Sequence, residues 1–286
     1  MLVGLCACNT SGHKEQDRLV VSIPPQKYLL DRLVGDRMEV VCMVEQSANP
    51  ETFEPTIKQL TAVENSLAYF KIGNMGFEDA LSERIGKNGN IRLFDTSKGI
   101  DFIRGSHEQH DDVDDSDAQT HEEHHHEIDP HVWSSARNCI VIAQNMLSAL
   151  NEIDPEGKAF YQNNFERLHT ELKQLDDSIS TILTGSKNTA FIVWHPSLSY
   201  FARDYSLKQV SLEHEGKESS IKGFRARLDK TESAGAHVFF YQKEYDNRQM
   251  SDIAYQLHLR LVQINPMNED IRSELLTTAK VISAHE

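Results

Sequence analysis

The feature that most constrains the fold is a repeated alternation of short apolar runs with amphipathic segments. An apolar run of four to six residues is typical of a buried strand, and longer segments with apolar residues every three or four positions are typical of helices. Strands that alternate with helices form parallel sheets covered on both faces. At 286 residues the chain exceeds the usual size of a single core. We therefore expect an α/β protein with two lobes.

Each half of the chain supplies four expected strands, so each lobe should hold a central four-stranded, mainly parallel sheet flanked by helices. The expected strands are 19–23, 40–44, 67–72, 91–94, 190–194, 208–212, 237–241 and 260–264. The expected helices within the lobes are 24–35, 56–65, 77–85, 134–150, 197–205, 222–235, 248–258 and 269–283.

A long helix is expected to join the two lobes. Asp154 and Pro155 supply an N-cap and a proline in the first turn, and apolar residues then recur every three or four positions from Phe165 to Ile182. A helix of about 28 residues spans roughly 40 Å and would form a rigid spine. The predicted division is a signal remnant and tether at 1–17, a first lobe at 18–154 with a His-rich loop at 105–127, the linking helix at 155–183 and a second lobe at 184–286.

The charge balance argues for a cation as the ligand. The chain has 44 acidic and 29 basic residues, but nine of the acids and none of the bases fall within 107–127. No basic stripe is available for phosphates, so nucleic acid is not an expected partner. No apolar run reaches the roughly 20 residues of a membrane-spanning helix. Contact with a membrane is expected only through a lipid anchor.

The anchor is predicted from the first residues. A short apolar stretch ends in Leu5, Cys6, Ala7 and Cys8 and is followed by a polar tether. Leu5 and Ala7 stand at −3 and −1 from Cys8, as in a bacterial lipobox, and Cys8 would then carry the lipid. The alternative is an ordinary apolar N-terminus, which the missing basic segment favours. We prefer the lipoprotein interpretation, with the recorded start inside a longer signal.

The His-rich segment predicts weak, multivalent metal binding in a disordered loop. Within 107–127 there are six histidines and nine carboxylates, with almost no residues that could form a core. Imidazole and carboxylate are both ligands for zinc and its neighbours. A merely solvated loop would explain the acids but not the clustered histidines. The histidines are His107, His110, His121, His124, His125 and His126.

Two further histidines stand at positions that suggest a second, ordered metal site. His131 lies between Pro130 and an apolar pair at the start of an expected helix, and His195 ends an expected strand of the other lobe. Ligands of parallel sheets bind beyond the carboxyl ends of the strands. Either histidine alone could be a satisfied core residue, but the two could meet across a cleft. Carboxylate-bearing loops also follow strands at 45–56 and 242–248.

Five short motifs in this order resemble the zinc and manganese substrate-binding lipoproteins of bacterial ABC transporters. The resemblance extends over nearly the whole chain from Leu19 onward and includes the His-rich insertion typical of zinc members. The motifs are Asn49 to Pro55, Gly73 to Glu78, Asp95 to Ile100, Asp129 to Trp133, and His195 with Pro196.

The resemblance implies two α/β lobes joined by a rigid helix, with one metal ion in the cleft held by two side chains from each lobe. His131 would be a first-lobe ligand and His195 a second-lobe ligand. Asp246 corresponds to an acidic fourth ligand, with Glu244 as the competitor. Where the family usually has histidine this chain has Glu51, so the first ligand would be a carboxylate. Two nitrogens and two carboxylates suit zinc, but also manganese or iron.

The expected function is therefore extracytoplasmic capture of a divalent transition metal, zinc first, and its delivery to an ABC permease. The protein would be a lipid-anchored monomer of the periplasm or cell surface, and not an enzyme. A zinc hydrolase is the alternative from another class, but the only HExxH spacing, His121 to His125, falls in the expected disordered loop and not on a helix, and no nucleophile elbow or phosphate loop is present. A third possibility is a His-rich buffer without transport.

Overall fold

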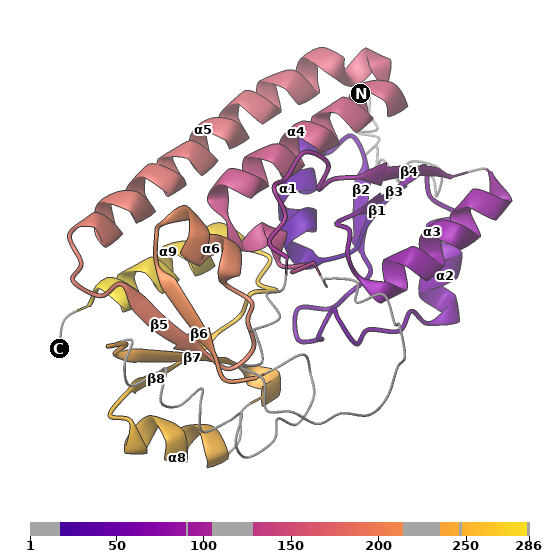
Figure 1. Cartoon of the computed structure of the whole chain (residues 1–286). Helices are drawn as coiled ribbons and strands as arrows, with labels where there is room; N and C mark the ends of the chain where they lie inside the picture. Colours follow the sequence, from indigo (N-terminus) through magenta and orange to yellow (C-terminus); the bar gives the residue numbers. More distant parts are fainter. Residues whose placement is uncertain (1–17, 90, 105–127, 214–234, 246–247, 285–286) are drawn as a thin grey trace, which may run out of the picture.

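The computed structural model describes residues 18–89, 91–104, 128–213, 235–245 and 248–284 (Figure 1). Several sequence predictions lie outside these residues. They are Cys8 as the predicted lipidation site, the six histidines of the predicted His-rich loop, Asp246 and all but the last residue of the expected helix at 222–235.

The first lobe is built on a four-stranded sheet in the order β2-β1-β3-β4, with every neighbouring pair parallel. β1 is central, and its apolar side chains are almost fully buried because helices cover both faces of the sheet. The strands are β1 (Arg18–Val21), β2 (Glu39–Cys42), β3 (Ala68–Lys71) and β4 (Arg92–Asp95).

The second lobe repeats this arrangement in a sheet of order β6-β5-β7-β8, again with all pairs parallel. Its strands are β5 (Ala190–Val193), β6 (Lys208–Ser211), β7 (Val238–Gln242) and β8 (Arg260–Ile264). Two sheets with the same order and four parallel strands each, flanked by helices, confirm the predicted fold class.

The helices of the first lobe are α1 (Pro24–Val34), α2 (Ile57–Glu64), α3 (Gly76–Asn88) and α4 (Ala136–Ile153), with the 3-10 turn η2 (Val132–Ser134). Those that follow are η3 (Pro155–Gly157), α5 (Lys158–Thr184), α6 (Ser199–Asp204), η4 (Lys243–Tyr245), α8 (Arg248–Gln256) and α9 (Ile271–Ser283). In the described part of the chain, no helix combines the length and apolar character needed to cross a membrane.

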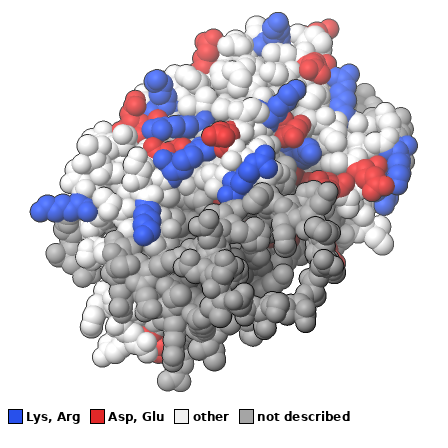
Figure 2. Space-filling model, in the orientation of Figure 1, with Lys and Arg blue, Asp and Glu red and all other residues white. Residues whose placement is uncertain are grey.

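The long helix α5 runs along the outside of both lobes, side by side with α4 (Figure 1). It packs against α1 of the first lobe and α9 of the second. Its buried face carries the expected stripe from Phe165 to Ile179. At its ends the stripe differs from the prediction, because Tyr161 and Leu183 are buried and Ile182 is only partly buried. Lys and Arg alternate with Asp and Glu over the visible surface of the upper helices (Figure 2).

Two helix starts differ from the sequence prediction. A continuous helix was expected from Ser134, but α4 begins at Ala136, because the Ser135 hydroxyl accepts a hydrogen bond from Asn138 N at 3.0 Å and acts as the N-cap. The helix expected from Pro155 starts with a 3-10 turn, since Asp154 caps Gly157 N before α5 begins at Lys158. Side-chain caps therefore set both boundaries.

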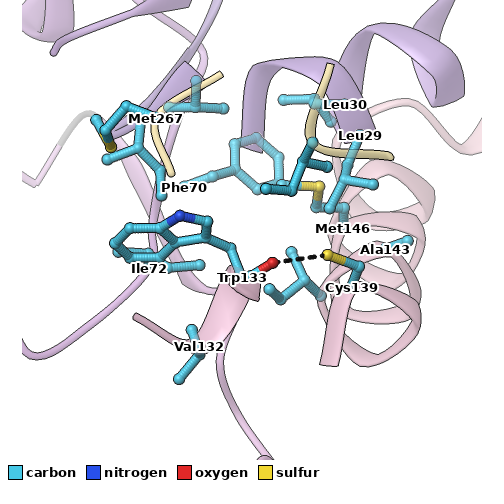
Figure 3. Close-up of a cluster of buried hydrophobic side chains, with 14 of the residues drawn as sticks. Leu29, Leu30, Phe70, Ile72, Val132, Trp133, Cys139, Ala143, Met146 and Met267 are labelled. Carbon is cyan, nitrogen blue, oxygen red and sulfur yellow. Dashed lines mark hydrogen bonds between the residues drawn. The ribbon is translucent and has the colours of Figure 1, made fainter. Parts of the chain in front are cut away.

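The hydrophobic core continues from one lobe into the other around Trp133 (Figure 3). The indole is buried among Phe70 and Ile72 of the first lobe and Met267 of the second. Its Nε1–H donates to Pro266 O at 2.8 Å, so the hydrogen bond also joins the lobes. A smaller apolar cluster lies on the other face of the second sheet, under α8.

A buried carboxylate, Glu78, ties α3 to the ends of β1 and β3. It accepts hydrogen bonds from the backbone N–H of Ile72 at 2.7 Å and of Gly73 at 2.6 Å, and from the Ser22 hydroxyl. These hydrogen bonds lower the pKa of Glu78, but burial outweighs them and raises it to about 7. The folded protein therefore binds this proton more tightly than the unfolded chain, whose glutamate has the ordinary pKa near 4.5.

Glu78→Gln should reduce the pH dependence of stability. In the wild type, the unfolded chain loses the Glu78 proton first as pH rises from about 4.5 to 7, so the free energy of unfolding falls by about 3 kcal/mol over this window. Denaturant titrations at pH 5 and 7.5 should show most of this decrease in the wild type and in the exposed control Glu83→Gln. If Glu78→Gln retained the same decrease, the carboxylate would not titrate as stated.

Candidate metal centre

Three predicted ligands converge where the two lobes meet. Glu51 lies in the loop that follows β2, His131 directly precedes η2, and His195 follows β5. His195 comes two residues after β5, and the loop that carries Glu51 begins at the end of β2, so both lie on the side where parallel sheets present ligand-binding residues. The two histidines are almost fully buried, and Glu51 is the more exposed member.

The potential ligand atoms form a nearly equilateral triangle. His131 Nε2 lies 3.3 Å from His195 Nε2, and Glu51 Oε1 lies 3.7 Å and 3.5 Å from these two nitrogens. Ligand atoms at about 2.0–2.1 Å from a tetrahedral ion stand about 3.3–3.4 Å apart. The triangle is therefore close to three corners of a tetrahedral zinc site.

A carboxylate orients each histidine. Asp129 Oδ1 lies 2.9 Å from His131 Nδ1, and Glu213 Oε2 lies 2.8 Å from His195 Nδ1. A carboxylate at Nδ1 holds the proton on that nitrogen of the neutral ring and leaves the Nε2 lone pair free for a metal. Both Nε2 atoms face the triangle. Glu213 is not among the residues predicted from the sequence, and Asp129 is named there only within a motif.

The charge of the site is arranged to favour a cation. Burial opposes protonation of His195, but the hydrogen bonds and negative charges of Glu213 and Glu51 outweigh it and raise the pKa of His195 to about 9. Burial would raise the pKa of Glu51, yet the His195 hydrogen bond and the charges of His131 and His195 lower it. The carboxylate is therefore ionised at neutral pH, and the proton on His195 stands where a metal ion would bind.

A cavity of about 10 Å³ adjoins the histidines. This is about the space that one water molecule or a single ion requires. Glu244, the alternative fourth ligand, lines this cavity, but its carboxylate is not part of the cluster whose ligand atoms lie within 4.8 Å of one another. Asp246, the first choice, falls outside the described residues.

The family described as zinc-uptake complex component A, periplasmic, matches residues 19–278 of this chain. The chain belongs to this family. The resemblance inferred from the five motifs is thereby confirmed, as is the expected class of function, the binding component of a zinc-uptake system. Proteins of this family work with ABC permeases and lie outside the cytoplasm.

Individual relatives agree with this assignment. The high-affinity zinc uptake system protein ZnuA of Bacillus subtilis is 28% identical over 218 residues, covering 74% of this chain and 67% of that protein. A putative metal-binding protein of Chlamydia trachomatis is 25% identical over 263 residues, covering 92% and 89%. The crystal structure of a ZnuA deletion mutant with zinc bound has a TM-score of 0.82 at 29% identity, covering 95% and 100%.

Glu213→Ala should weaken metal binding although Glu213 is not part of the triangle. Without the carboxylate, His195 is free to rotate and to change tautomer, and such losses typically cost 10- to 100-fold in metal affinity. Competition titration with a chelating dye would measure the affinity. Glu166→Ala, an exposed residue of α5, is the control and should bind like the wild type. Equal affinity in the Glu213 variant would contradict the orienting role.

Proposed function

We propose that this protein captures one Zn²⁺ ion at Glu51, His131 and His195 and delivers it to an ABC permease. The observation that carries the proposal is the triangle of two imidazole nitrogens and one carboxylate oxygen with tetrahedral spacing. A fourth ligand would come from Asp246, from Glu244 or from water. The carboxylates behind the histidines support the proposal, since metal-binding histidines almost always have such partners.

Zinc is preferred over manganese or iron. A site with two imidazoles and carboxylates binds all three ions, but zinc binds more tightly than divalent manganese or iron at a given nitrogen and oxygen site. The zinc-bound ZnuA structure supports the same choice. Competition between Zn²⁺ and Mn²⁺ on the purified protein is the direct test. Tighter retention of Mn²⁺ would overturn the choice of zinc while leaving a metal-binding protein.

We further propose that the protein acts as a monomer anchored to a bacterial membrane through a lipid on Cys8. The support is the lipobox-like order of Leu5, Ala7 and Cys8. Mass spectrometry of protein expressed with its natural leader would detect a diacylglycerol on Cys8. An unmodified Cys8 in that experiment would contradict the anchor.

The His-rich segment is proposed as a weak, auxiliary metal site. Deleting residues 107–127 should leave one tight Zn²⁺ per molecule, because the triangle lies in ordered parts of the two lobes, and should remove only weakly bound ions. Calorimetry with elemental analysis measures both classes of site. Loss of the tight ion on deletion would instead favour a His-rich buffer as the main function.

A further inference from the structure

Beside the triangle, a hydrogen bond joins the two lobes. Asn49 lies in the first-lobe loop that carries Glu51, and Tyr245 ends η4 of the second lobe. Asn49 Nδ2 donates to the Tyr245 hydroxyl oxygen at 3.1 Å. Both side chains line the small cavity next to His131 and His195. We refer to this hydrogen bond as the Asn49–Tyr245 bridge.

Each end of the bridge also contacts a proposed ligand. At the first-lobe end, Asn49 Oδ1 accepts a hydrogen bond from the backbone N–H of Glu51 at 2.9 Å. At the second-lobe end, the Tyr245 ring stacks on the His195 imidazole, with a centroid distance of 5.7 Å and an interplanar angle of 15°. The side-chain amide of Asn49 therefore connects the backbone of Glu51 with Tyr245, whose ring stacks on His195.

The position of Glu51 makes this connection important. The side chains of His131 and His195 are 4% and 7% exposed, whereas that of Glu51 is 34% exposed. Glu51 lies in an irregular loop between β2 and α2, and the histidines are packed into the joint between the lobes. The outer side of the site is therefore closed by Glu51, and the backbone of Glu51 is held by its hydrogen bond to the Asn49 side chain.

We infer that the Asn49–Tyr245 bridge holds the Glu51 loop over the bound ion and thereby slows its release. This inference rests on the proposed zinc-binding function. Tyr245 is a positioning residue here: its ring supports His195 and its hydroxyl holds Asn49, and it does not itself ligate the metal. For Glu51 to leave the ion with its loop, the bridge has to break. Permease docking would trigger release by breaking this hydrogen bond beside the site.

Tyr245→Phe is the direct test, because it removes the hydroxyl and keeps the ring. Zinc-loaded protein is mixed with excess chelator, and the dissociation rate constant is measured by stopped flow. We expect it to rise about fivefold, the equivalent of the ~1 kcal/mol that a typical hydrogen bond contributes. The association rate constant should not change. Tyr205→Phe, which removes a hydroxyl bonded to Asp176 away from the site, should release zinc like the wild type.

The pairing is tested with Asn49→Ala and the double variant. Asn49→Ala should release zinc faster than Tyr245→Phe, since it also removes the acceptor for Glu51 N–H. Adding Tyr245→Phe should then have no further effect. Wild-type dissociation in Tyr245→Phe, or additive effects in the double variant, would overturn the inference while zinc binding persisted. A wild-type protein that failed to retain zinc would instead refute the proposed function.

Discussion

Replacing His195 with alanine is expected to weaken zinc binding by at least 100-fold. Tight zinc sites have apparent binding free energies of about 10–16 kcal/mol at neutral pH, or about 3 kcal/mol or more for each of four ligands. The loss of one ligand should therefore reduce affinity by a factor on the order of 10² to 10³. His195 is nearly buried, and its Nε2 lies 3.3 Å from His131 Nε2 and 3.5 Å from Glu51 Oε1, so its loss removes one corner of the triangle.

The affinity would be measured by competition with a chelator of known zinc affinity. His169→Ala is a suitable control, because His169 lies on α5 near Phe165 and away from the triangle. It should bind zinc like the wild type. If His195→Ala retained wild-type affinity with an unchanged fold by circular dichroism, the triangle would not be the tight site.

Acidification is expected to weaken zinc binding about tenfold for each pH unit below 9. His195, with a pKa of about 9 in the metal-free protein, must lose its proton before Nε2 can bind the ion. Between pH 8 and pH 6 this proton alone should lower the apparent affinity about 100-fold. Above pH 9 its effect disappears. Glu51, whose pKa is lowered, remains ionised throughout this range.

Calorimetry in buffers of different ionisation enthalpy at pH 7 should show the release of about one proton from His195 for each zinc bound. Glu213→Ala removes a negative charge that raises the pKa of His195. In this variant the zinc affinity should therefore begin to fall at a lower pH than in the wild type. An affinity that did not change between pH 6 and pH 8 would contradict a protonated His195 in the metal-free site.

Hydrophobic patterning was sufficient to predict the eight strands, because each buried strand of a parallel sheet is a short apolar run. β8 has the predicted bounds, and the other strands differ at their ends by one or two residues. Helix ends were less predictable, as Ser135 and Asp154 show. Their caps depend on which backbone N–H groups the fold leaves unpaired, and periodicity carries no such information.

In the site, the histidines were predictable because His131 directly precedes a helical turn and His195 follows the end of a strand. Glu213 was not, since its role depends on which strands are neighbours. β5 pairs with β6 so that Val193 lies opposite Ser211, and two residues further along His195 lies beside Glu213. Two residues 18 positions apart thus become partners through sheet order, which the pattern of apolar runs does not specify. The Asn49–Tyr245 bridge depends on lobe packing in the same way.

The core around Trp133 has a consequence for how this protein could change its metal preference. His131 and His195 come from different lobes, yet the distance between them is set by the same packed side chains that keep the lobes together. A substitution that enlarges or shrinks a side chain in the core around Trp133 would change the distance between the two histidines. It would therefore alter both the ionic radius that the site accepts and the melting temperature. We therefore expect metal selectivity and thermal stability to be coupled, so that selection for a different ion would act through the protein interior or through the more exposed Glu51.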